Sequence, residues 1–230
     1  MGQNVTRLSS VGSLRHYRAD QAPHPDVPLR CTDGCPVADH CPFYAPSIYL
    51  EHRPWGNREM SWPMSTLAHG DLSHAAILQA LQEGPYGRCV YHCDNDVVDN
   101  QIVTMETEAH TSIALFMHGH SHEESRTMRY DGTHATLSGL FTNTRSEIRV
   151  HDHLTNQVEI VQPLEIEGGH GGGDTGLIAA FIQTLRGNNG HPALTSARAS
   201  LESHLLAFAA EQARQDGTVI DMTAFRAAAF

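Results

Sequence analysis

The chain has 230 residues, of which 40% are hydrophobic and 18% charged, a composition typical of a globular protein and not of a disordered one. Its formal net charge of −11 argues against binding to the phosphate backbone of nucleic acids, which needs clustered Lys and Arg. No apolar run approaches the roughly 20 residues that cross a bilayer, and the N-terminus does not resemble a signal peptide. We therefore expect one cytoplasmic domain over residues 1–230, with no membrane partner and no nucleic-acid partner.

The N-terminal part alternates between regular and irregular segments. The first predicted strand occupies residues 4–17, where β-forming and polar residues alternate. Residues 18–70 then form an irregular insertion that carries most of the prolines, three cysteines and both tryptophans. A stretch of this length without periodicity is often functional. The helix predicted next begins at Asp71 or Ser73 and ends at Gly84.

The middle of the chain is nearly all β. Short β-forming runs separated by turn residues occupy positions 88–92, 101–108, 111–118, 125–131, 134–140, 146–153 and 158–164. Hairpin turns are expected at 108–112 and 131–134. The pattern predicts an antiparallel meander.

Two helices and a short strand follow the meander. The first helix is predicted over 174–187 with Asp174 as N-cap, and the second over 196–217 with Ser196 as N-cap. The last strand is predicted at 218–222. The expected fold class is α+β: an open, mostly antiparallel sheet with helices packed on one face, plus the irregular Cys/Pro-rich insertion.

Cysteines form the first candidate site. Their spacing is C-x3-C-x5-C in the insertion, with a second x3 pair later in the chain: Cys31, Cys35, Cys41, Cys89 and Cys93. Four thiolates at about 2.3 Å close a tetrahedral zinc site, and His40 or His92 could replace one of them. Buried reduced thiols and a disulfide are the alternatives. A metal here would be structural, because a Pro-rich loop buries too little apolar surface to order itself.

Histidines form a second candidate site. His118 and His120 are followed by Glu124 in an H-x-H-x3-E pattern, which is also the core of the metal motif of cupins. No second half-motif with a third histidine follows it. The alternative is a solvated strand end.

Two further stretches could contact a polyhydroxylated ligand. The glycine-rich stretch 167–174 contains His170; it is not interpreted as a dinucleotide fingerprint, because no βαβ unit surrounds it. The stretch 91–101 is dense in Asp and Asn side chains, which bind a cation or sugar hydroxyls, or form turns that bond their own backbone.

Several stretches together resemble one family. They read GSLRHYRAD, RCTDGCPVADHCPFYAPSIYL, GPYGRCVYHCDNDVVDNQIVTME, GGHGGGDTGLIAAF and LTSARASLESHLLAFAAE. In this order they resemble the C-terminal domain of the glucose–fructose oxidoreductase / inositol dehydrogenase / rhizopine-catabolism (Gfo/Idh/MocA) family, in a branch with a cysteine-rich insertion. The resemblance covers nearly the whole chain.

The resemblance implies an NAD(P)-dependent oxidoreductase that acts on sugars, polyols or related compounds. Relatives pair a Rossmann domain with an open antiparallel sheet that builds the substrate pocket and often the oligomer interface. The cofactor fingerprint, the catalytic lysine and the catalytic acid/base of the family have no counterpart here. We therefore expect a truncated or mis-started product, or one half of a split enzyme, with no catalytic or cofactor-binding residues of its own and with NAD or NADP bound only in the full-length relative.

What the resemblance assigns to single residues concerns the substrate. His170 matches the H-G-G-x-D stretch near the family's substrate pocket, and Asp94, Asn95 and Asp96 match a stretch that faces the same region. The leading hypothesis is thus a substrate-binding and oligomerisation domain with a Rossmann-domain partner, expected to be a homo-oligomer. The alternatives are a non-catalytic module that binds a sugar or a partner, and a cupin-like metal enzyme.

Overall fold

The computed structural model has an α+β fold, as the sequence predicts, and divides into two compact units. One unit comprises residues 1–119 and 210–230 and the other residues 120–209, where the sequence analysis expected one domain. The structure describes residues 3–51, 63–121, 125–142, 145–163, 172–187 and 196–229.

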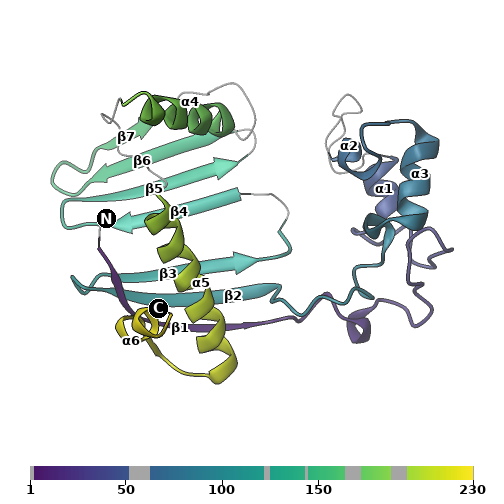
Figure 1. Cartoon of the computed structure of the whole chain (residues 1–230), viewed down its shortest axis with the longest axis horizontal. Coiled ribbons are helices and arrows are strands. Elements are labelled where there is room, and N and C mark those ends of the chain that lie inside the picture. The colour runs from purple at the N-terminus through teal and green to yellow at the C-terminus, as the bar shows by residue number, and fades with distance from the viewer. Residues whose placement is uncertain are drawn as a thin grey trace. The chain divides into compact units, whose positions relative to one another are not determined.

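The first unit contains an antiparallel sheet with the strand order β3-β2-β1-β8 (Figure 1). Its strands are β1 (Val5–Ser13), β2 (Asn100–Thr107), β3 (Ser112–His118) and β8 (Ile220–Asp221). Helix α6 (Met222–Ala228) follows β8 directly and contacts β1 through the guanidinium of Arg226, which donates to the carbonyl oxygen of Val5 at 3.0 Å. Leu8 and Met222 are both fully buried, so apolar contact stabilises this part of the sheet.

The insertion has more regular structure than the sequence predicts. It contains the short helices η1 (Ala19–Gln21), α1 (Ala45–Tyr49) and α2 (Met64–Leu67), and is followed by α3 (His74–Glu83) and η2 (Pro85–Gly87). Ser73 caps α3 as predicted, since its hydroxyl accepts from the backbone N–H of Ala76 at 3.2 Å. A small core joins α1, α2 and α3 and includes Cys31, Ala45, Met64, Leu67, Ile77 and Leu81.

The second unit contains a four-stranded antiparallel meander, β4-β5-β6-β7 (Figure 1). Its strands are β4 (Ser125–Asp131), β5 (Ala135–Thr142), β6 (Ser146–Asp152) and β7 (Val158–Val161), followed by α4 (Gly173–Leu185). The long helix α5 (Ala197–Asp216) crosses the boundary between the two units. Ser196 caps it as predicted, accepting from the N–H of Ala199 at 3.1 Å.

Two local expectations are wrong. Residues 88–92 are not a strand, because Arg88 makes only an isolated bridge to Arg30 and the following residues turn. Asp174 is not the N-cap of α4: Gly172 holds that position with a φ of 81°, and Asp174 lies in the first turn. Among the described helices, none combines the length and apolar character needed to span a membrane.

Candidate functional site

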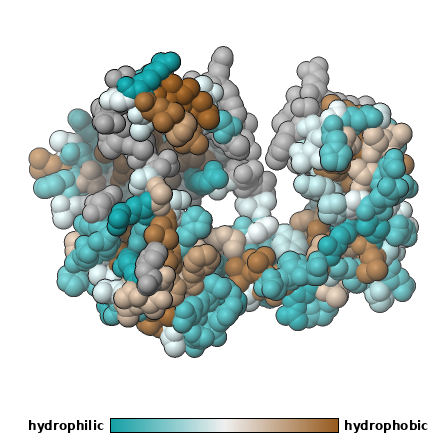
Figure 2. Space-filling view, in the orientation of Figure 1, coloured by the Kyte–Doolittle hydropathy of each residue, from teal (hydrophilic) through white to brown (hydrophobic). Residues whose placement is uncertain are grey.

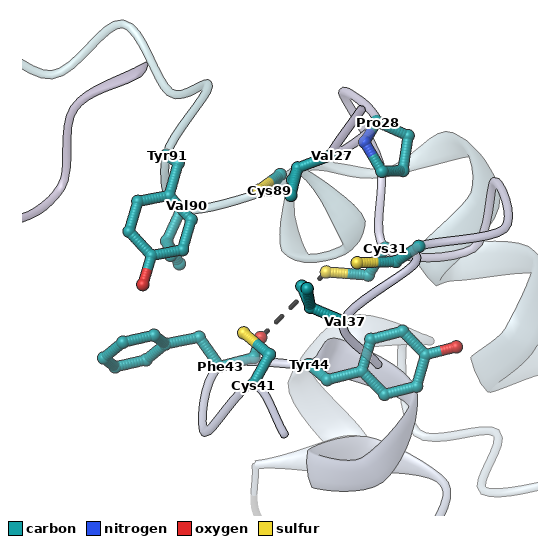
Figure 3. Close-up of a pocket in the computed structure, with 11 residues that line it drawn as sticks. Val27, Pro28, Cys31, Val37, Cys41, Phe43, Tyr44, Cys89, Val90 and Tyr91 are labelled. Atoms are coloured by element: carbon teal, nitrogen blue, oxygen red, sulfur yellow. Dashed lines mark hydrogen bonds between the residues drawn. The ribbon is translucent and has the colours of Figure 1, made fainter. Parts of the chain in front are cut away.

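Four of the five cysteines line one small cavity in the first unit (Figure 3). The cavity has a volume of about 10 Å³ and is lined by Cys31, Cys35, Cys41, Cys89 and the side chains of Val27, Pro28, Val37, Phe43, Tyr44, Val90 and Tyr91. Cys93 is not among them; its thiol donates to the carbonyl oxygen of Cys89 at 3.2 Å. All five cysteines are free thiols. The structure thus assembles the predicted cysteine cluster without its fifth member.

Backbone hydrogen bonds bring the two cysteine-bearing segments together. The N–H of Cys31 donates to the carbonyl of Gly87 at 2.9 Å, and the N–H of Cys89 donates to the carbonyl of Leu29 at 2.8 Å. These two bonds flank the antiparallel bridge between Arg30 and Arg88. Cys31 and Cys89, which are distant in sequence, therefore face the same cavity from paired backbones.

Turns bring Cys35 and Cys41 to the same place. Gly34 has a φ of 81°, a conformation that glycine adopts without steric cost, and it reverses the chain after Cys31. The N–H of Cys41 then donates to the carbonyl of Val37 at 2.9 Å. The x3 and x5 spacings thus correspond to successive turns of one folded loop.

The cavity opposes thiol ionisation in some respects and favours it in others. Burial raises the pKa of Cys31, and the neighbouring thiols Cys89, Cys41 and Cys35 raise it further, while the backbone amide of Ala45 lowers it. Burial likewise raises the pKa of Cys41 and of Cys89. These thiols are therefore neutral at pH 7 unless a cation shares the cavity.

The structure brings four of the predicted metal ligands to one cavity but does not hold them in coordination geometry. Among the described residues, no three His, Cys, Asp or Glu side chains stand together in a ready metal-binding arrangement. The imidazole of His92 is engaged through Nε2 with the carbonyl oxygen of Val27 at 3.0 Å, and His40 is exposed. Neither histidine is among the residues that line the cavity, so the cysteines alone are its candidate ligands.

The predicted substrate residues lie on an exposed loop. Asp94, Asn95 and Asp96 follow the cysteine segment and line neither the cysteine cavity nor the second hollow described below. The guanidinium of Arg88 donates to Asp94 at 2.6 Å, and this hydrogen bond lowers the pKa of the carboxyl group. His170 lies outside the described residues, so its grouping with this loop stays a prediction.

One carboxylate of the same stretch has a structural role that the sequence did not indicate. Asp99 is buried, and its Oδ2 accepts hydrogen bonds from the backbone N–H groups of Arg15 and His16 at 2.9 and 2.5 Å. Asn100 donates to its Oδ1 at 2.7 Å. Burial raises the pKa of this carboxyl, but the donated hydrogen bonds prevail and hold it at about 2. Asp99 therefore anchors the chain where it leaves β1.

A hollow on the first sheet, lined by both apolar and polar side chains, was also not predicted. It has a volume of about 400 Å³ and is lined by residues of β1, β2 and β3 and by Val219. Arg7 forms an ion pair with Glu106 at its rim, and the hydroxyls of Ser9 and Thr104 lie 2.8 Å apart. The alternation of β-forming and polar residues in these segments predicts strands. It does not indicate that one face of the sheet contains a hollow.

The candidate metal site of His118, His120 and Glu124 does not lie in the barrel fold that a cupin requires. His118 ends β3, while Glu124 lies outside the described residues. Cupin chemistry needs a closed β-barrel, and the described strands form two open sheets. The cupin-like hypothesis therefore has no support from the fold.

Comparisons with known proteins give little further identification. No family model matches the chain, and no curated protein matches it. A solved structure, of a "putative NADPH-dependent oxidoreductase" from Desulfitobacterium hafniense DCB-2, is 14% identical with a TM-score of 0.44. The match covers 58% of this chain and 40% of that one, so the chain spans less than half the length of the protein it matches.

Proposed function

We propose that the chain is the substrate-binding and oligomerisation part of a cytoplasmic NAD(P)-dependent oxidoreductase that acts on a sugar, a polyol or a related compound. The observation that carries the proposal is the exposed apolar surface of the second unit. An α+β layer that leaves so much apolar side chain in water is typical of a surface that packs on a partner.

This exposed surface includes the helix after the meander. Leu177, Phe181 and Leu185 recur every four residues along α4 and are 57%, 60% and 71% exposed. Figure 2 shows a hydrophobic patch over this helix. Further exposed apolar residues of the same unit are Met128, Tyr130, Leu154, Val158, Ile160, Val161, Ile178, Ile182, Leu201 and Phe208. We assign this surface to contacts with a Rossmann domain or a second copy of the chain.

The substrate is assigned to the exposed loop of Asp94, Asn95 and Asp96. Carboxylate and amide groups on an exposed loop accept and donate hydrogen bonds to hydroxyl groups of a sugar or polyol. Arg88 keeps Asp94 ionised, which favours its role as a charge-assisted acceptor.

The cofactor is assigned to the partner and not to this chain. The nicotinamide of NAD or NADP would be bound by the Rossmann domain, which supplies hydride chemistry when the cofactor is present. This chain would position the substrate against it.

Calorimetric titration tests the assignment. We expect no binding of NAD(H) or NADP(H) by the chain alone, and weak binding of glucose or myo-inositol that Asp94→Asn or Asp96→Asn reduces at least threefold. Asp152→Asn, at the end of β6 in the second unit, is the control and should leave polyol binding unchanged. Micromolar binding of nucleotide, or polyol binding unaffected by both loop variants, would overturn the proposal.

The hollow on the first sheet favours a second candidate, a non-catalytic binding module. Its volume of about 400 Å³ is within the range of small-molecule sites. Ser9 and Thr104 present hydroxyls inside it, and Arg7 and Glu106 present charges. If Thr104→Val abolishes polyol binding while Asp94→Asn does not, the hollow is the binding site and this candidate is correct.

A further inference from the structure

The cysteine cavity admits a more specific inference, which does not depend on the proposed function. Four cysteines from two separate segments line it (Figure 3). The fifth cysteine, Cys93, is only four residues from Cys89 but does not line the cavity, and its thiol donates to the carbonyl oxygen of Cys89. If the cysteines served only as small buried apolar residues, they would not need to line the same cavity. The selection of four is what a tetrahedral metal ion requires.

The size of the cavity limits what it can hold. A volume of about 10 Å³ is close to the room that one water-sized sphere occupies. One metal ion fits such a space, whereas a cube of four iron and four sulfide ions does not. The collar of Val27, Val37, Phe43 and Tyr91 excludes further water ligands. The site would therefore be closed and structural, with no open coordination position for a substrate.

We propose that Cys31, Cys35, Cys41 and Cys89 bind one Zn²⁺ ion as a tetrathiolate site that fastens the insertion to the segment after η2, and that Cys93 is not a ligand. Binding converts four thiols to thiolates and releases their protons to solvent, with no change of oxidation state. A dication offsets the mutual repulsion of four thiolates, which an apolar cavity could not hold otherwise. Tetrahedral coordination at about 2.3 Å places the four sulfur atoms about 3.8 Å apart in the zinc-bound form.

Metal analysis of the full chain, purified without chelator, tests the site. We expect about one zinc per chain in the wild type and in Cys93→Ser, and less than a tenth of that in Cys35→Ser and Cys89→Ser. Cys93 and Cys89 belong to the same short segment, so Cys93→Ser is a matched control. Zinc lost equally from Cys93→Ser, or no zinc in the wild type, would overturn the proposal.

A second measurement covers the case in which a ligand variant fails to fold. In the zinc-bound wild type, a thiol reagent should modify Cys93 rapidly and the other four cysteines only after chelation. Cobalt substituted for zinc should give the charge-transfer and d–d bands of tetrahedral thiolate coordination. Five equally reactive thiols with no such bands would contradict a metal site, and a mass 2 Da lower per bridge under non-reducing conditions would show a disulfide in its place.

Discussion

The carboxylate of Asp99 accepts a hydrogen bond from the backbone N–H of His16, which joins the residue before β2 to the segment that leaves β1. The same oxygen accepts from Arg15, and Tyr17 donates to it at a longer 3.4 Å. Three consecutive amides are thus satisfied by one buried side chain. A buried amide without an acceptor is costly, so this anchor contributes to the stability of the first unit.

Removing the anchor should destabilise the chain. We expect Asp99→Ala to lower the free energy of unfolding by about 2–3 kcal/mol, because three amides lose their charged acceptor. Urea denaturation followed by circular dichroism measures the change. Asp96→Ala, three residues earlier on the exposed loop, is the control and should stay within about 0.5 kcal/mol of the wild type. An equal loss in both variants would contradict the anchoring role.

The same carboxylate should make stability depend on pH. Its pKa is lowered from 3.8 to about 2 in the folded chain, so the stabilisation is fully present above the unfolded value and is lost as pH falls from about 4 to 2. The contribution is about 2 kcal/mol. Unfolding measured at pH 5 and pH 2.5 should show a smaller loss for Asp99→Asn than for the wild type. Parallel pH profiles would mean that another group causes the acid sensitivity.

Periodic elements were predictable from the sequence because their signals are local. The strands β1 to β7 lie within or close to the β-forming runs that predict them, and the helix ends were visible in Ser73, Ser196 and the glycines Gly187 and Gly217, which adopt φ values of 78° and 63°. Helix α6 was missed because it has only seven residues, although Asp221 caps it with two backbone bonds, to Thr223 and Ala224. A seven-residue element shows too few turns for its period to be recognised.

The sequence predicted that cysteines would form the site, but not which of the five would line the cavity. The spacing of Cys89 and Cys93 repeats that of Cys31 and Cys35. Both members of the earlier pair line the cavity, whereas only Cys89 of the later pair does so. The N–H of His92 bonds the carbonyl of Cys89 at 3.0 Å, and this turn separates the two thiols. Asp99 was likewise one acid among several in the sequence, because its partners lie more than 80 positions away. The conformation of one turn decides which thiol of the later pair lines the cavity, and long-range contacts decide the role of Asp99.

Two glycines should respond oppositely to alanine. A Cβ at Gly87 would lie 1.7 Å from the carbonyl oxygen of Leu81, and Gly87 also accepts the bond from Cys31 that aligns the cysteine segments. Gly87→Ala should therefore cost at least about 2 kcal/mol and lower the zinc content. At Gly176, in α4, a Cβ would meet nothing within 4 Å, so Gly176→Ala should be neutral or stabilise by up to about 1 kcal/mol. Thermal unfolding and metal analysis measure both, and a stable, zinc-loaded Gly87→Ala would contradict the close packing.

The apolar surface of α4 should govern self-association. Phe181 is 60% exposed near the middle of the helix, so Phe181→Glu places a charge where a partner would pack. We expect the variant to shift from oligomer to smaller species in light scattering coupled to gel filtration, and to bind less of a hydrophobic dye.

The control for this surface is an exposed apolar residue of the first unit. Leu72 is 48% exposed just before α3, and Leu72→Glu adds the same charge away from the α4 patch. Its oligomeric state should match that of the wild type. If both variants dissociate alike, net charge and not the α4 surface controls assembly. If the wild type is already monomeric and binds no Rossmann domain, the patch has no partner and the proposed oligomerisation role is wrong.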